Sequence, residues 1–295
     1  MSLLVKIGRA FLKYAPDKVF LQLYYRKNMG RFMRFRNPST FNEKIQWLKV
    51  NDRKPLYNRI ADKYDVREYV KEILGEEYLI PIYAMWERIE DIDFDILPNE
   101  FVMKCTHDSG SVVVCRDKSS LDKEKAIQKL RDGFSRNAYN YAREWQYKDI
   151  KPRIIVEKLL VEDDDIGKER PTGIIDYKFF VFNGKPRFYY ASRGLEDHAT
   201  ACISFYDLHG NKMPFKRGDY EEFEGAIAPT HLDTMIKLAT KAGETIGSDF
   251  IRVDFYEIGG KIYFSEFTLH PCSGVMPIIP KEWDSILGSW LQISK

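Results

Sequence analysis

The sequence predicts an α+β protein in which strands occur in runs and helices separate those runs. Three observations support this fold class. Apolar stretches typical of strands follow one another from residue 172 onward, and helical periodicity marks residues 121–147. Hydrophobic residues make up 44% of the 295 positions and aromatic residues 14%, so the chain is expected to bury a core. No apolar run reaches the length of a membrane span.

Two helices are expected ahead of the first strand. In "NPSTFNEKIQWLKVND", Thr40 and Glu43 fit a capping box at the start of an amphipathic helix. The stretch "PLYNRIADKYDVREYVKEILG" predicts a second helix, which begins at Pro55 and ends at Gly75.

The middle of the chain alternates strands with one long helix. A short strand is interrupted by Pro81, and "EFVMKCTHDSGSVVVCRD" is typical of a strand, a polar glycine loop and a second strand. A helix is expected over residues 121–147. A buried strand is expected from Arg153 to Val161, followed by an acidic turn from Glu162 to Asp165.

The last third predicts hairpins and two helices. Asn183-Gly184 indicates one hairpin, and His209-Gly210-Asn211 indicates another. A helix is expected from Thr230 to about Gly247, then a hairpin over residues 250–268. A final helix is expected in "KEWDSILGSWLQI".

The N-terminal segment is strongly basic. Residues 1–36 carry nine basic residues and one acid, a net charge of +8, whereas the remainder is −6. Apolar residues are interspersed, so the segment suits either an anionic membrane surface or an ordinary pair of helices with a solvated basic face. No nucleic-acid-binding pattern occurs, and no nucleic-acid partner is expected.

Sequence features predict a cytoplasmic location. The start of the chain shows no cleavage site behind a long apolar run, and the four cysteines are scattered without CxxC spacing. The basic segment suggests one alternative to a purely cytoplasmic location: residues 1–36 would contact the inner face of the plasma membrane peripherally.

Two acids lie inside the hairpin "FIRVDFYEIGGKIYFSEFTLHP". With a three-residue turn at Gly259-Gly260-Lys261, Asp254 lies opposite Glu266, and Arg252 lies opposite Thr268. A two-residue Gly259-Gly260 turn would place the two acids on opposite faces.

Opposed carboxylates require a neutralising group. Their Cβ atoms would be about 4.5–5.5 Å apart, so one acid would be protonated unless a cation lies between them. Mg²⁺ suits two carboxylates completed by waters and phosphate oxygens. The competing interpretation is an ion-pair network in which Arg252 and Lys261 satisfy Asp254 and Glu266.

Further ionised residues interrupt apolar strands. Lys104 ends the run Phe101-Val102-Met103 and precedes a polar loop that contains Ser109 and Gly110. Such loops can present backbone N–H groups to phosphate, and a neighbouring lysine adds a positive charge. Glu157 and Lys178 interrupt two other strands. Together with the acidic hairpin, these residues predict a nucleotide–metal site.

The order of these motifs resembles the ATP-grasp superfamily. "FVMKCTHDSGSVVV" is similar to the family's strand, lysine, glycine loop and strand, and "RIIVEKLL" is similar to its hinge strand. "IRVDFYEIGGKIYFSEFTLHP" resembles the metal hairpin, with Thr268 where most members have Asn. The segments "STFNEKIQWLK", "KCTHDSG", "DYKFFVFNGKP" and "EFTLHP" resemble the TupA-like branch, which shares the threonine.

The resemblance implies two α+β lobes that clasp ATP, with an added basic helical N-terminus. The implied division is residues 1–55 for the basic helical segment, 56–100 for an N-terminal α/β part, 101–160 for the small lobe and 161–295 for the large lobe. The branch is associated with teichuronopeptide and bacterial surface-polysaccharide synthesis, and its members are often labelled glycosyltransferases.

The resemblance also implies roles for individual residues. Lys104 and Lys178 would contact ATP phosphates, Ser109 and Gly110 would lie in the mobile phosphate loop, and Glu157, Lys158 and Leu160 would line the adenine and ribose pocket. Asp254, Glu266 and Thr268 would hold Mg²⁺. Arg252 and Lys178 would be catalytic, with Arg252 facing the transferred phosphoryl group. His107 and Asp108 match the branch without a defined role, and Arg193 and His270 are weaker candidates for acceptor contacts.

The implied function is an ATP- and Mg²⁺-dependent carboxylate–amine ligase that acts through an acylphosphate. It would attach an amino acid or another amine to a uronic acid of a surface glycan or lipid-linked glycan. The alternatives are a sugar kinase with Asp108 or Asp176 as base, a glycosyltransferase and a non-catalytic scaffold. Asp163-Asp164-Asp165 is expected to be a solvated loop rather than a nucleotide-sugar motif, and the presence of Lys104, Asp254 and Glu266 argues against the scaffold.

Overall fold

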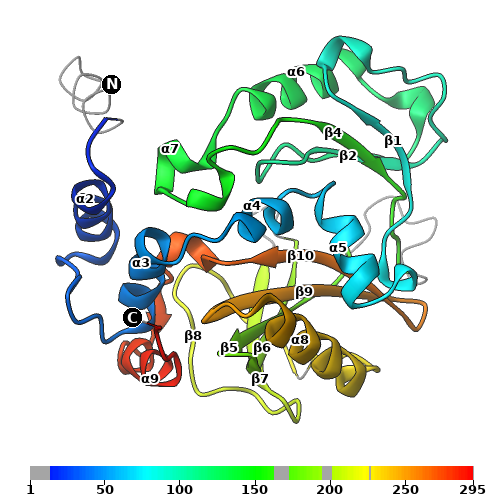
Figure 1. The fold of residues 1–295 in the computed structure, drawn as a ribbon. Helices are drawn as coiled ribbons and strands as arrows, with labels where there is room; N and C mark the ends of the chain where they lie inside the picture. Colours follow the sequence, from blue (N-terminus) through cyan, green and yellow to red (C-terminus); the bar gives the residue numbers. More distant parts are fainter. Residues whose placement is uncertain (1–13, 163–172, 195–200, 226, 295) are drawn as a thin grey trace.

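A computed structural model describes residues 14–162, 173–194, 201–225 and 227–294. The first 13 residues of the basic segment and residues 163–165 of the predicted acidic turn lie outside the described residues. Within the described part, the chain forms two main antiparallel sheets with helices packed on them (Figure 1). This arrangement confirms the α+β class.

The smaller sheet has four strands in the order β1-β4-β2-β3, and every neighbouring pair is antiparallel. Its strands are β1 (Ile82–Trp86), β2 (Phe101–Cys105), β3 (Val113–Cys115) and β4 (Ile154–Glu157). Helix α6 (Lys123–Phe134) packs on β2 and β3, where its Ala126 and Leu130 are buried, and Figure 1 shows this helix next to the smaller sheet. The polar glycine loop between β2 and β3 was predicted correctly.

The larger sheet has five antiparallel strands in the order β10-β9-β5-β6-β7. Its strands are β5 (Asp176–Phe182), β6 (Lys185–Arg193), β7 (Cys202–Asp207), β9 (Phe250–Ile258) and β10 (Lys261–Thr268). The predicted hairpin at Asn183-Gly184 is confirmed. The predicted second hairpin is reduced to one bridge between Tyr206 and Lys212. The chain after it instead forms β8 (Lys216–Arg217), which pairs with β11 (Ile278–Ile279).

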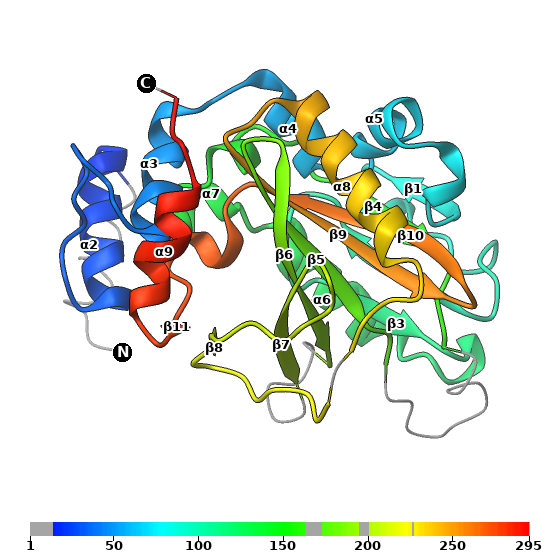
Figure 2. The ribbon, with the colours of Figure 1, turned by 90° about the horizontal axis from the view of Figure 1, so that it is seen from below.

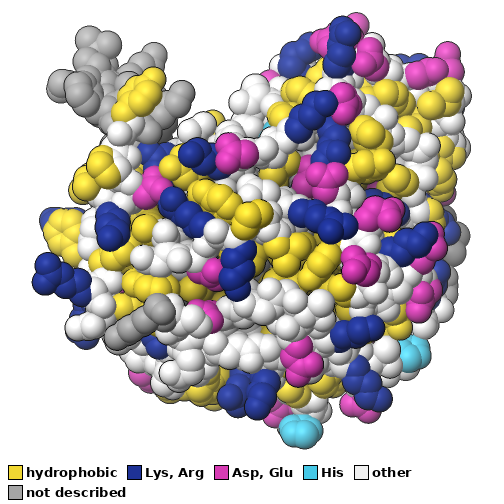
Figure 3. All heavy atoms as spheres, in the orientation of Figure 1, with side chains coloured by type: hydrophobic (Ala, Val, Ile, Leu, Met, Phe, Trp, Pro, Cys, Tyr) yellow, Lys and Arg dark blue, Asp and Glu magenta, His cyan; other side chains and the backbone are white. Residues whose placement is uncertain are grey.

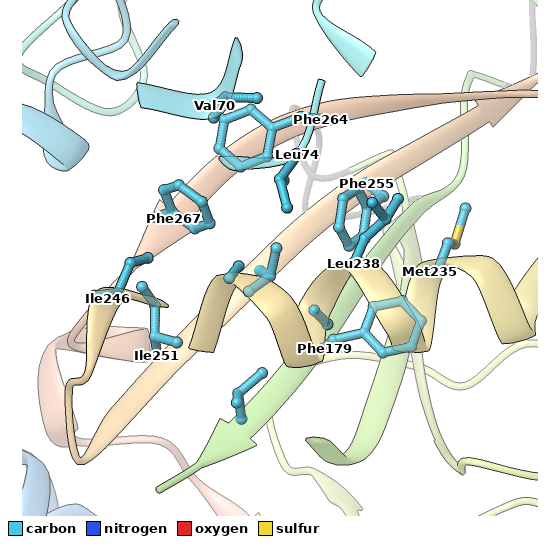
Figure 4. Packing of buried hydrophobic residues seen from close by; sticks show 14 of the residues in the cluster. Val70, Leu74, Phe179, Met235, Leu238, Ile246, Ile251, Phe255, Phe264 and Phe267 are labelled. Carbon is cyan, nitrogen blue, oxygen red and sulfur yellow. The ribbon is translucent and has the colours of Figure 1, made fainter. Parts of the chain in front are cut away.

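Helices cover both faces of the larger sheet (Figure 2). On one face lies α8 (Leu232–Ile246), where Met235 and Leu238 meet Phe179 and Phe255 of the sheet (Figure 4). On the other face, α3 (Phe41–Asn51) and α9 (Glu282–Trp290) enclose an aromatic cluster. The sheet is therefore buried on both sides, which explains its continuous apolar strands.

Two predicted helices are interrupted in the structure. The helix expected from Pro55 to Gly75 divides into α4 (Pro55–Ala61) and α5 (Val66–Ile73), because the Asp62 carboxylate accepts backbone N–H bonds from Tyr64 and Asp65 between them.

The helix expected over residues 121–147 likewise ends at Phe134 in α6. It is followed by α7 (Ala138–Ala142), whose N-cap is Asn137, and by a 3-10 turn at Trp145–Tyr147. The predicted capping box of Thr40 and Glu43 at the start of α3 is confirmed.

Strand β4 is shorter than predicted: it ends at Glu157, and the following residues leave the ladder. Near the N-terminus, α2 (Asp17–Met29) lies at the edge of the molecule (Figures 1 and 2). None of the helices in the described ranges is both long and apolar enough to span a bilayer.

The acidic hairpin contains a feature that the sequence analysis missed. Its turn is the two-residue Gly259-Gly260, both with positive φ, so the prediction of a three-residue turn is wrong. A β-bulge at Ser265 then shifts the register by one residue, and Glu266 pairs with Asp254 as predicted. The inference that a two-residue turn must separate the acids is also wrong, because the extra residue restores their pairing.

The packing of α8 gives a stability prediction. Met235 is completely buried beneath the larger sheet, whereas Lys237 on the same helix is exposed. We expect Met235→Ala to lower the free energy of unfolding by about 2–5 kcal/mol, because it leaves a cavity. We expect Lys237→Ala to change it by less than about 0.5 kcal/mol. Urea unfolding of both variants measures the difference, and equal effects would show that α8 does not anchor the sheet.

Candidate active site

Arg252 is the centre of a buried charge cluster on the larger sheet. Its Nε and Nη2 atoms donate to both oxygens of Asp254, at 2.7 and 2.6 Å. The same Nη2 lies 3.0 Å from Glu266 Oε1 and 2.9 Å from Thr268 Oγ1. The guanidinium therefore bridges the two acids whose pairing was predicted, and all four side chains lie on one face.

The cation that neutralises the acid pair is thus Arg252, as the ion-pair interpretation required. Lys261, the other cation of that interpretation, does not take part. It is exposed at the hairpin turn, where its Nζ lies 4.9 Å from the Tyr263 ring centroid.

Lys178 supplies a second buried cation. It lies opposite Asp254 in the pairing of β5 with β9, and its Nζ is 2.8 Å from Asp254 Oδ2. The same Nζ also donates to Asp176, two residues earlier on β5. Burial alone would lower the pKa of Lys178, but Asp176 and Asp254 outweigh it and raise this pKa well above its ordinary value. Lys178 is therefore a charged ammonium group.

Glu266 remains ionised and partly accessible. Burial would raise the pKa of its carboxyl, but the positive charges of Arg252, Lys178, Lys63 and Lys104 lower it to about 2. Its side chain is 38% exposed, whereas that of Asp254 is completely buried. Glu266 is consequently the member of the acid pair that is open to a ligand.

The oxygen atoms of this cluster fit Mg²⁺ in one specific way. Both oxygens of Asp254 are bound by Arg252, and one of them also by Lys178. In the described ranges, no three His, Cys, Asp or Glu side chains are grouped so that they could hold a metal ion. Mg²⁺ commonly uses one or two carboxylates and completes its shell with waters and phosphate oxygens. Glu266 offers such a carboxylate, and Thr268 adds a hydroxyl.

A cavity of about 190 Å³ lies beside the smaller sheet. Four of the residues predicted to contact nucleotide line it: Lys104, Glu157, Lys158 and Leu160. Lys104 Nζ is 2.6 Å from Glu157 Oε2, and the other walls are mainly apolar, including Val102 and Val114 on neighbouring strands. Apolar walls with a polar edge suit a planar heterocycle.

A larger cavity of about 780 Å³ adjoins the first, and the two share Val112, Val114, Ile174 and Tyr256 in their walls. Ser109 and Gly110 line it from the loop between β2 and β3. Strands of the larger sheet line the opposite side with Asp176, Ser192, Arg193 and Tyr256.

Three polar atoms of residues in this wall have no hydrogen-bond partner in the described ranges: Asp176 Oδ1, Ser192 Oγ and Arg193 Nε. All three atoms are buried. Asp176 lies opposite Ser192 on β6 and opposite Tyr256 on β9. Burial raises the pKa of Asp176 to about 6, against the lowering effect of Lys178. Unpaired buried polar atoms at a cavity wall suit a polar ligand.

His107 and Asp108 hold the glycine loop in place. Ser111 Oγ donates to Asp108 Oδ1, and His107 Nε2 lies 3.1 Å from the carbonyl oxygen of Arg136. Lys63 Nζ donates to the Asp108 carbonyl at 2.7 Å. Both residues are buried, so their contacts order the loop and set the position of Ser109 and Gly110 beside it.

Several site residues were missed or underestimated from the sequence. Lys63 was assigned to a helix interior, yet it follows the break after α4 and its charge acts on Glu266. The residue that could have indicated this break is Asp62, which directly precedes Lys63. Its carboxylate accepts a hydrogen bond from Thr106 Oγ1 at 2.9 Å, and this bond connects the break between α4 and α5 to the glycine loop. Asp176 was considered only as a kinase base, and Ser192 and Tyr256 were not considered.

The two weaker candidates differ in their positions. Arg193 lines the larger cavity. His270 is buried, and burial together with the charges of Lys49 and Arg53 lowers its pKa well below the ordinary value, so its imidazole is neutral.

A family model described as TupA-like ATPgrasp matches residues 43–292. A search of curated proteins finds no match.

Solved structures with a similar fold include several ligases. The D-alanine–D-alanine ligase of Bacillus anthracis is 17% identical, with a TM-score of 0.40 over 72% of this chain and 57% of that one. The Helicobacter pylori enzyme is 14% identical, with a TM-score of 0.42 over 94% of this chain and 69% of that one. An L-amino acid ligase of Bacillus licheniformis is 13% identical, with a TM-score of 0.43 over 79% of this chain and 50% of that one. The chain thus spans little more than half of the first of these ligases.

The lowered pKa of Glu266 gives a pH prediction. Its carboxylate is stabilised by the fold, so its contribution to stability is present above pH 4.5 and is lost as the pH falls toward 2. We expect Glu266→Gln to cost about 1 kcal/mol at pH 7, a value limited by solvent screening, and less at pH 3. Urea unfolding across this pH range is the measurement.

Glu244→Gln, at an exposed position on α8, is the matched control and should show no such trend. A pH-independent difference between wild type and Glu266→Gln would contradict the charge assignment.

Proposed function

Because the chain belongs to the TupA-like ATP-grasp family, we propose that it is an ATP- and Mg²⁺-dependent ligase that joins a carboxylate to an amine. The observation that carries this proposal is the placement of Lys178, Arg252 and Glu266 in one cluster, which is joined to the wall of the larger of two adjoining cavities through Asp176, the acceptor of a bond from Lys178. Such a cluster supplies positive charge and an ionised metal ligand without a protein nucleophile.

The smaller cavity would hold the adenine and ribose. Its lining by Glu157, Lys158 and Leu160 supports this placement. Lys158 N–H donates to the Pro81 carbonyl at 2.9 Å, and the backbone beyond Lys158 has left the β-ladder and can bond a base edge. Lys104 at one end of this cavity would contact the phosphates, and Ser109 and Gly110 would cover them.

Glu266 and Thr268 would hold Mg²⁺, with Asp254 as a further ligand or as the group that fixes Arg252 and Lys178. When bound, Mg²⁺ would neutralise the negative charge that develops on the transferred phosphoryl group. The remaining contributions come from this chain's own cations, which are already oriented by buried acids and need little reorganisation.

The proposed chemistry has two steps. An oxygen of the carboxylate substrate attacks the γ-phosphorus, the bond from that phosphorus to the bridging oxygen of ADP breaks, and an acylphosphate forms. The amine nitrogen then attacks the acyl carbon, and inorganic phosphate leaves with the bonding electrons as the amide forms.

Arg252 and Lys178 would stabilise the negative charge in both steps. Asp176 lines the larger cavity, and its Oδ1 has no protein partner in the described ranges, so this carboxylate can accept the proton that the amine releases.

The substrates that we propose are a uronic acid of a bacterial surface polysaccharide or its precursor and an amino acid or amine. The association of the TupA-like branch with surface-polysaccharide synthesis supports this class. The larger cavity, about 780 Å³, is of the size that holds a small organic ligand. A lipid-linked glycan acceptor would place the reaction at the cytoplasmic face of the plasma membrane.

A sugar kinase is the second candidate, and one observation favours it. The raised pKa of Asp176, near 6, suits a base that removes a proton from an acceptor hydroxyl. Asp108, the other base considered, is bonded to Ser111 and buried beneath the loop, so it is less suited to that role.

Nucleotide binding is the first test. We expect Mg²⁺ with ATP to raise the melting temperature, since ligand at a hundredfold excess over Kd adds about 2.7 kcal/mol of stability. UTP, GTP and UDP-sugars should give smaller shifts. Lys104→Ala and Glu266→Gln should lose most of the ATP shift, whereas Lys237→Ala on the exposed face of α8 should retain it. A shift with UDP-sugars and none with ATP would favour a glycosyltransferase.

Product analysis separates the ligase from the kinase. Incubation with Mg²⁺, ATP, a uronic acid and an amino acid should release phosphate, and mass spectrometry should show an amide. Arg252→Lys keeps a buried positive charge and should lower the rate by about 10²-fold or more, because the bidentate geometry is lost. A phosphorylated sugar without amide would establish the kinase instead.

A further inference from the structure

Helix α2 and the residues that follow it present an apolar stripe to solvent. Leu21 and Tyr25 are buried toward the body of the protein, one helical turn apart. On the outer side, Val19 is 50% and Leu23 is 44% exposed, and Phe32 beyond the end of the helix is 50% exposed. An ordinary surface helix carries polar residues at such positions.

Basic side chains surround this stripe. Lys18, Arg26, Lys27, Arg34 and Arg36 are all exposed. Between residues 14 and 39 the chain has a single acid, Asp17. Its carboxylate faces inward, where Arg53 Nη2 lies at 2.5 Å and Tyr139 Oη at 2.8 Å. The acid is thus neutralised by other parts of the protein and does not offset the exposed positive charge.

The apolar and basic groups form one continuous surface. The guanidinium of Arg26 lies 4.6 Å from the Phe32 ring centroid, and Lys18 Nζ lies 5.3 Å from that of Phe35. Figure 3 shows hydrophobic and basic side chains alternating along the edge of the molecule where α2 lies. Arg31, by contrast, is bound to Glu43 and to the Tyr25 hydroxyl and serves the fold.

We propose that α2 and residues 30–36, here called the α2 surface, bind the face of an anionic lipid bilayer. An anionic surface complements the basic side chains, and the acyl region accepts Val19, Leu23 and Phe32 without requiring a shaped pocket. Each basic residue near such a surface strengthens binding by about fivefold. The α2 surface therefore provides reversible attachment in which charge and apolar contact both contribute.

This inference goes beyond the proposed function and does not depend on it. Lipid binding needs neither ATP nor acceptor, so it can be measured whatever reaction is catalysed. A peripheral enzyme held in this way would work at a bilayer face, where lipid-linked glycans are available.

Vesicle sedimentation of the full chain tests the proposal. We expect the protein to pellet with vesicles of phosphatidylcholine and phosphatidylglycerol and to stay in solution with phosphatidylcholine alone. Binding should fall steeply with added salt, because screening weakens the charge attraction. Arg26→Glu combined with Lys27→Glu should weaken binding by about 25-fold or more. Val19→Ser combined with Leu23→Ser should also weaken binding. The size of this decrease in affinity should depend less on salt concentration than the decrease caused by the charge variant.

Lys237→Glu combined with Lys241→Glu is the matched control, because it makes the same charge change at exposed positions of α8. It should bind vesicles like the wild type. Failure of the wild type to bind anionic vesicles, or equal losses in the α8 and α2 charge variants, would overturn the proposal.

Light scattering tests whether the α2 surface instead binds a second copy of this chain. If the wild type is a dimer, the serine pair makes it monomeric, and anionic vesicles do not bind either form, the α2 surface is a self-association face. The melting temperature of each variant without ligand shows whether the variant is folded, and its ATP-induced melting shift reports separately on the nucleotide site.

Discussion

The buried contact of Arg252 with Asp254 and Glu266 is the constraint on which the rest of the site depends. Asp254 is completely buried, and a carboxylate in such a place is stable only when cations and hydrogen bonds satisfy it. Arg252 satisfies it from the same strand and Lys178 from the neighbouring one. Removal of either cation would leave an uncompensated charge, which typically costs about 3–5 kcal/mol.

The same contact fixes the geometry of three strands. Lys178 meets Asp254 only in the observed register of β5 with β9, and Arg252 meets Glu266 and Thr268 only because Ser265 forms a bulge in β10. Without that extra residue, the tight Gly259-Gly260 turn would direct Glu266 to the other face. A local departure from a regular ladder thus positions the one acid that is open to a ligand, and such departures are typical of functional sites.

Much of the site could be predicted because it depends on local pairing. The acids face one another across a single hairpin, and Lys104 and Glu157 lie on adjacent strands that the apolar pattern identifies. The turn was predicted wrongly, yet the pairing was correct, because the bulge compensates for one missing turn residue. No simple alternation pattern reveals a bulge, since it appears only when both strands are aligned by their partners.

The residues that were missed depend on tertiary contacts. Lys63 lies in a sequence with good helical periodicity, and only the bond from Thr106 to Asp62 shows why the helix breaks there. In the sequence, Ser192 and Tyr256 cannot be told apart from ordinary strand residues. They line the cavity because they pair with Asp176 from the two neighbouring strands. The long helix expected over residues 121–147 was interrupted for a similar reason, because the cap at Asn137 outweighs helix propensity.

Asp254 and Glu266 pair across the hairpin of β9 and β10, but they have different physical roles. Both oxygens of Asp254 are occupied by Arg252 and Lys178, so its main effect is to hold two positive charges in fixed positions. Glu266 shares Arg252 but keeps 38% of its side chain exposed, and four positive charges keep it ionised. Asp254 therefore holds the two cations in place, and Glu266 remains available to a ligand. A site that attracts phosphate needs buried positive charges that are stabilised by an acid. It also needs some of that positive charge to remain, so the acids must not neutralise it completely.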